Sequence, residues 1–126
     1  MRIIKSADRT IAWVFDGRFE EGTKPLTDEK WALQVINLKH PKGKVLVAHR
    51  HQPIRRTTES LMEMLMVMTG LVRVTIYDHQ NPVEVIELTA GQGVMLIDGG
   101  IGIEILEDAE MLEFKNGPFV EDKVVI

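Results

Sequence analysis

The sequence predicts an all-β fold, either a barrel or a sandwich, from two observations. Short apolar runs rich in valine and isoleucine recur along the chain at a spacing of about eight to twelve residues, which is typical of such folds. Turn-forming pairs such as Asp16-Gly17, Asn81-Pro82 and Gly99-Gly100 separate these runs. The one segment with a helical signal is a short turn at Thr27–Trp31, with Thr27 as its cap.

Each expected strand combines β-branched or aromatic residues with alternation or a short continuous apolar run. In chain order the expected strands are Arg2–Lys5, Thr10–Phe15, Ala32–Leu38, Lys44–His51, Leu61–Met68, Leu71–Tyr77, Val83–Leu88, Val94–Ile97, Gly102–Leu106 and Glu110–Lys115. No linker, low-complexity segment or long repeat divides the chain. A single domain over residues 1–126 is therefore the expected organisation.

Composition excludes several classes of function. The chain has 126 residues and no cysteine, so disulfides, thiolate metal sites and cysteine nucleophiles are excluded. Its basic residues are dispersed and its formal net charge is -4, which argues against nucleic-acid binding. The first residues lack the pattern of a signal peptide, and no apolar run approaches the roughly 18 residues of a membrane span. We therefore expect a soluble, cytoplasmic protein that does not bind a membrane.

Alternation in two of these strands predicts that three ionisable side chains point into the interior of the barrel. Side chains two residues apart on a strand point to the same face, so His49 and His51 in Lys44–His51 can enter one space. In Leu61–Met68, Glu63 shares its face with three apolar residues. We expect both faces to line the interior of the barrel, with Glu63 near the two imidazoles.

The opposite face of Leu61–Met68 consists of methionines, namely Met62, Met64, Met66 and Met68. Four exposed methionines in a row would form an unusually large apolar patch on an isolated barrel. The methionine face therefore predicts a cover, either a second sheet or a second subunit, and we expect a homodimer.

The spacing around the histidines resembles the first sequence motif of the cupin superfamily, Gly-x5-His-x-His-x3,4-Glu-x6-Gly. Gly43, His49, His51, Glu63 and Gly70 stand at the fixed positions, with eleven residues between His51 and Glu63 in place of three or four. The resemblance covers about residues 44–115. It implies a cupin-type jelly-roll β-barrel of the small single-domain bacterial kind, loosely similar to sugar-nucleotide ketoisomerases.

The second cupin motif, Gly-x5-Pro-x-Gly-x2-His-x3-Asn, is matched in its glycines only. Gly91 and Gly99 keep their positions, whereas Ile97, Gly102 and Leu106 stand where the family has proline, histidine and asparagine. The metal site that the resemblance implies, three histidines and one glutamate, therefore lacks its third imidazole.

Three functions remain open for such a pocket. Because imidazole titrates close to neutral pH, His49 and His51 with Glu63 can act as acid and base in an isomerase or epimerase for a carbohydrate-like substrate. Alternatively, His49, His51 and Glu63 form a two-histidine, one-carboxylate set that binds iron, manganese, nickel or zinc as cofactor. The loss of histidine at Gly102 favours a third possibility, a non-catalytic ligand-binding or sensing protein.

Arg55, Arg56 and Glu104 are the candidate ligand-binding residues. Arginines near a pocket mouth suit a carboxylate or phosphate group on a small-molecule ligand. The resemblance turns Gly102, and with it Glu104, toward the interior. Alternation of Ile101, Ile103 and Ile105 as the core face places Glu104 outside. His79 is expected at the surface, in the turn between two strands.

Overall fold

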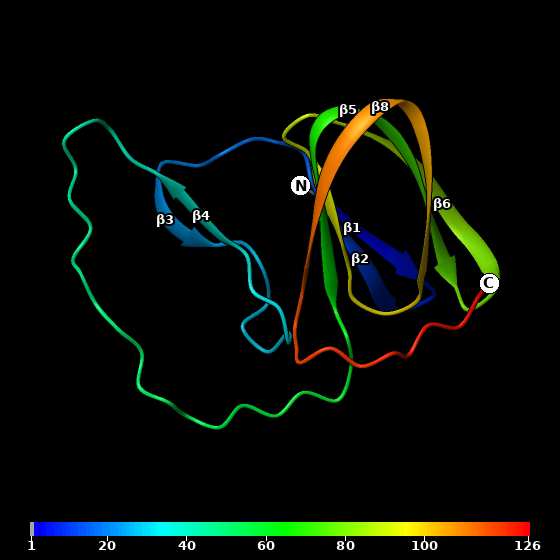
Figure 1. The fold of residues 1–126 in the computed structure, drawn as a ribbon, viewed down its shortest axis with the longest axis horizontal. Coiled ribbons are helices and arrows are strands. Elements are labelled where there is room, and N and C mark those ends of the chain that lie inside the picture. Colours follow the sequence, from blue (N-terminus) through cyan, green and yellow to red (C-terminus); the bar gives the residue numbers. More distant parts are fainter. Residues whose placement is uncertain (1) are drawn as a thin grey trace. The chain divides into compact units, whose positions relative to one another are not determined.

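The computed structural model describes residues 2–126, within which the chain is all-β and contains no helix (Figure 1). In chain order the strands are β1 (Arg2–Ser6), β2 (Arg9–Phe15), β3 (Gly22–Pro25), β4 (Ile36–Lys39), β5 (Glu63–Asp78), β6 (Asn81–Thr89), β7 (Gly93–Leu96) and β8 (Gly100–Lys115). The described part of the chain thus has no helix that could cross a membrane.

The chain forms two compact units. The larger consists of the chain up to Arg18 together with Leu61–Ile126, and the smaller of Phe19–Ser60. The single domain expected over residues 1–126 therefore stays a prediction.

The larger unit is built on one strongly curled antiparallel sheet, a half-barrel, of order β1-β2-β7-β5-β6 with β8 on the other side of β5. β5 and β8 are each 16 residues long and run side by side, from Glu63 opposite Lys115 to Tyr77 opposite Gly100 (Figure 1). Along its other edge β5 pairs first with β7 and then with β6. The β5–β8 ribbon is therefore common to both halves of the sheet.

Gly70 lies where the β5–β8 ribbon bends. The pairing register between the two strands shifts on both sides of Thr69, and Gly70 has a φ of +92°. A Cβ atom at this position would overlap the carbonyl oxygen of Asp108 and come within 2.7 Å of the Cα of Ala109. Leu61–Met68 and Leu71–Tyr77, expected as separate strands, form one strand because this glycine makes a bulge rather than a chain turn. The last two expected strands are likewise joined in β8.

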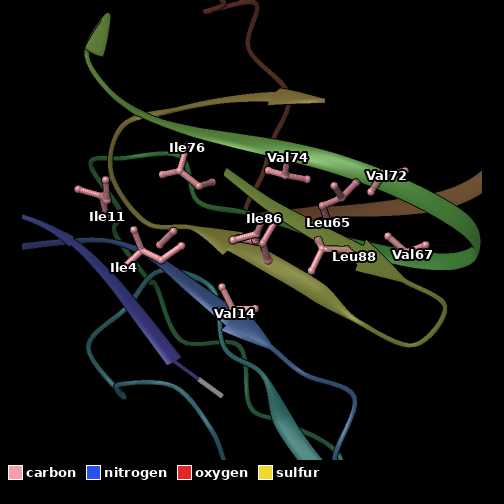
Figure 2. Packing of buried hydrophobic residues seen from close by; sticks show 12 residues of the cluster. Ile4, Ile11, Val14, Leu65, Val67, Val72, Val74, Ile76, Ile86 and Leu88 are labelled. Carbon is pink, nitrogen blue, oxygen red and sulfur yellow. The ribbon is translucent and has the colours of Figure 1, made fainter. Parts of the chain in front are cut away.

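The hydrophobic core fills the concave side of the curled sheet (Figure 2). Before the bend the buried side chains of β5 include Leu65 and Val67, as alternation predicts, and after it they are Val72, Val74 and Ile76. The shift of register at the bend changes the alternation from odd to even positions, so both halves of β5 keep their apolar side chains in the core. Strands β1, β2, β6 and β7 supply the other members, which are Ile4, Ile11, Ala12, Val14, Ile86, Leu88 and Val94.

The smaller unit contains the β3–β4 hairpin, of which β3 was not expected. Buried Asn37 secures it: its Nδ2 donates to the carbonyls of Glu20 (2.8 Å) and Gly22 (3.1 Å), and its Oδ1 accepts from the amide of Glu20 (3.0 Å). Thr27–Trp31 forms a turn, in which the amide of Trp31 donates to the carbonyl of Asp28 at 3.0 Å.

The prediction of a strand at Lys44–His51 is wrong. Residues 41–62 contain no strand, and every residue of 44–51 is exposed. A strand needs a neighbour for its backbone hydrogen bonds, and within the described residues none pairs with this segment. Alternating side chains therefore did not suffice to make it a strand.

The methionine face is partly buried within a single chain. Met62 and Met64 are each 3% exposed, whereas Met68 is 52% exposed. Half of this face thus has no need of a second subunit, and the homodimer stays a prediction.

Candidate functional site

Three turns of the larger unit converge at one end of the curled sheet. Ser6 Oγ, at the β1–β2 turn, donates to Asp78 Oδ2 (2.5 Å) at the end of β5. Arg9 Nη2 donates to Asp78 Oδ1 (2.5 Å), and its Nη1 donates to Asp98 in the turn between β7 and β8. His79 follows Asp78 directly, and we call these five residues the hairpin-end site.

Tight hairpins bring these side chains to the strand ends. Ser6 pairs with Arg9 and Asp78 pairs with Asn81, so each hairpin has a two-residue loop. The first loop residues, Ala7 and His79, have φ values of 51° and 54°. Positive φ values match such short loops to the right-handed twist of the strands they join.

The hydrogen bonds at Asp78 stabilise its ionised form. Donation from Ser6, then from Arg9 and His79, holds the pKa of this carboxyl well below its usual range. His79 Nδ1 lies 2.9 Å from Asp78 Oδ1. Because an ionised carboxylate can only accept, Nδ1 carries the proton in this hydrogen bond, and in the neutral ring Nε2 is then an acceptor.

Replacing Asp78 by asparagine is expected to remove an acid-sensitive part of the stability. The folded-state pKa is lowered, so the stabilisation is complete above the unfolded pKa of about 3.9 and is lost as pH falls toward the folded-state pKa. Urea unfolding of wild type and Asp78→Asn should show a difference that is constant near neutral pH and shrinks below about pH 4. Ser6→Ala removes the hydrogen bond that contributes most to the lowered pKa of Asp78, so it should lose part of this acid-sensitive stability. A difference independent of pH would contradict this.

A pocket of about 680 Å³ adjoins the hairpin-end site. Asp78, His79 and Asp98 line it together with Gln80, Asn81, Gly99, Gly100, Asp122, Val124, Val125 and Ile126. A second pocket, of about 530 Å³, shares Gly99, Gly100 and the C-terminal segment with the first and is also lined by Glu63, Tyr77 and Gly102. Carboxylate, amide and imidazole groups thus stand opposite an apolar chain segment in one hollow.

The expected histidine pair lies in the smaller unit, outside any strand. His49 and His51 are exposed, their ring centroids are 5.2 Å apart in an edge-to-face arrangement, and His49 Nδ1 lies 2.9 Å from the carbonyl of Val47. Arg55 and Arg56 are exposed in the same segment, where Arg56 donates to the carbonyl of Ile54 at 3.2 Å.

Glu63 belongs to the larger unit and begins β5. Its side chain is 16% exposed and lies 3.6 Å from Lys115 Nζ, a partner that offsets the cost of burying its charge. Within residues 2–126, no three or more histidine, aspartate or glutamate side chains gather as a metal site. His49 and His51 belong to the smaller unit and Glu63 to the larger, so the metal site expected from these three residues stays a prediction.

Glu104 lies on the outward face of β8, as alternation predicts. It stands opposite Arg73, whose guanidinium lies 3.4 Å from Glu104 and 3.4 Å from Glu87. Gly102 has the same orientation, and a Cβ there would meet the ring of Tyr77 at 3.4 Å. The position that corresponds to the third histidine of the cupin motif therefore faces Tyr77, away from the core side of the sheet.

No protein-family model, curated protein or solved structure matches this chain.

Sequence reasoning missed Ser6, Arg9, Asp78 and Asp98. The one feature of the sequence that could have indicated them is that each lies in or beside a turn between two strands. Arg9 and Asp78 are 69 residues apart, and only the pairing of the strands brings the two turns together.

Proposed function

We propose that the protein binds a small carbohydrate-like molecule in the pocket at the hairpin-end site. The pocket itself carries the proposal: at about 680 Å³ it falls within the range of about 300–1,000 Å³ that is usual for small-molecule sites. Asp98 and Asn81 can exchange hydrogen bonds with hydroxyl groups, while Val124 and Ile126 offer apolar surface to the C–H face of a sugar ring.

The same proposal places this pocket on a cupin-type jelly roll. Two features support it: the strongly curled antiparallel sheet with its apolar concave side, and the motif-like spacing from Gly43 to Gly70 in the sequence. In this proposal the functional residues lie at the end of the sheet, whereas the sequence motif places them at the histidine pair.

His79 suits this pocket to proton transfer, as in an aldose–ketose isomerase. Nδ1 of His79 is hydrogen-bonded to Asp78, so Nε2 is the ring nitrogen that can contact a ligand. Nε2 would accept the proton from the hydroxyl-bearing carbon next to the substrate carbonyl, giving an enediolate. The proton of that hydroxyl group would pass to the former carbonyl oxygen, and the imidazolium would return its own proton to the former carbonyl carbon, which leaves the carbonyl on the neighbouring carbon.

The His49–His51 pair is the second candidate for acid–base chemistry. The 5.2 Å between its rings favours it, since one small substrate can reach both imidazoles. The two candidates differ in their location, and variants of each can therefore tell them apart.

Backbone amide shifts during titration with aldoses, ketoses and their phosphates test the proposal. We expect shifts at Gln80, Gly99 and Gly100, saturable binding, and at least a tenfold weaker affinity for Asn81→Ala, because one hydrogen bond to the ligand is lost. The matched control, His49→Ala with His51→Ala, should bind like wild type.

Deuterium incorporation from D₂O into a bound sugar then tests the chemistry. His79→Gln should slow exchange at the carbon beside the carbonyl by roughly 10²-fold or more while binding persists. Shifts confined to residues 44–58, with loss of binding in the His49/His51 variant, would overturn the pocket and favour the histidine pair.

A further inference from the structure

Strand β8 has one edge without a partner. It pairs with β5 along its length, and no strand among residues 2–126 pairs with its other side. None of its 16 residues is buried, whereas all four residues of β7 are. An edge of this kind presents a row of backbone N–H and C=O groups that can pair with another extended chain.

The hydrophobic core is open on this side. Ile103 stands opposite Val74 and Ile105 opposite Val72, and residues directly opposite share a face of the sheet. Val72 and Val74 are fully buried, yet Ile103 is 39% exposed and Ile105 50% exposed. A further strand laid beside β8 would cover both isoleucines with its own apolar side chains.

The charge of β8 indicates which strand could bind there. The strand carries one lysine, Lys115, and five acidic residues, which are Glu104, Glu107, Asp108, Glu110 and Glu113. In residues 2–126 no basic group pairs with Glu107 or Asp108. A second copy of β8 would place carboxylates beside carboxylates, which is unfavourable, whereas Lys or Arg side chains would be attracted.

We propose that the free edge of β8 docks an extended segment of a partner protein in which apolar residues alternate with Lys or Arg. The segment adds to the sheet as a strand: its backbone pairs with β8, its apolar residues cover Ile103 and Ile105, and its basic residues meet the acidic side chains of β8. Of β8, only Gly100 lines the pocket at the hairpin-end site, and neither isoleucine nor any acidic residue of the strand does, so this proposal does not rest on ligand binding there.

Fluorescence anisotropy with a labelled peptide of alternating valine and lysine tests this docking. The full chain should bind it saturably, more weakly at high salt, and protect the amides of β8 from hydrogen exchange. A peptide N-methylated at alternate residues, with the same charge, should bind at least tenfold more weakly, because it cannot pair as a strand. A valine–glutamate peptide should not bind.

Charge reversal on the protein supplies the matched comparison. Glu107→Lys with Asp108→Lys should weaken binding at least tenfold, while Glu29→Lys with Glu59→Lys, the same charge change at exposed positions off the sheet, should weaken it less than threefold. Equal binding of the N-methylated peptide, or equal weakening by both double variants, would overturn the proposal.

Discussion

Replacing Gly70 by alanine is expected to lower the free energy of unfolding by about 3 kcal/mol. Of this, about 1 kcal/mol comes from placing a Cβ at a φ of +92°. The remaining roughly 2 kcal/mol comes from overpacking, since the Cβ would overlap the backbone of Asp108 and Ala109, which lies between two residues paired with β5, Glu107 and Glu110. Urea unfolding followed by circular dichroism measures the loss.

Gly91→Ala is the matched control for this change. Gly91 also has a positive φ, of +85°, but a Cβ there would meet nothing within 4 Å. It should therefore cost about 1 kcal/mol, the backbone contribution alone. Equal losses of stability in the two variants would show that the close approach of β5 and β8 at the bend does not contribute to the effect of Gly70→Ala.

Replacing Ile76 by alanine is expected to cost about 3 kcal/mol, because a fully buried side chain would leave a cavity in the core. Ile76 lies in β5 between β6 and β8, so the surrounding backbone is paired on both sides and can collapse little. The same urea unfolding experiment measures this effect.

Val85→Ala on β6 is the control, since Val85 is 54% exposed, and it should change stability by less than about 0.5 kcal/mol. A loss below about 1 kcal/mol for Ile76→Ala would mean that the interior of the curled sheet is loosely packed.

Local patterns predicted much of the fold. Turn residues and β-branched runs located most of the strands of the larger unit, and alternation placed Leu65 and Val67 in the core and Glu104 outside. These predictions succeeded because period-two alternation and turn chemistry act over a few residues.

Features that depend on distant partners escaped sequence reasoning. A glycine at position 70 is typical of the end of a strand. Its close approach to Asp108 on β8, which the sequence does not reveal, shows that it forms a bulge within β5. The segment Lys44–His51 alternates well, but no strand within residues 2–126 pairs with it. The site at Asp78 depends on Arg9, which lies 69 residues earlier in the chain.

The β5–β8 ribbon also has a consequence for local unfolding. Strand β5 pairs with β7, β6 and β8, so each half of the curled sheet depends on this one strand. Unfolding of the β5–β8 ribbon would therefore remove backbone hydrogen bonds from both halves. We therefore expect the ribbon and the strands paired with it to unfold in one cooperative transition.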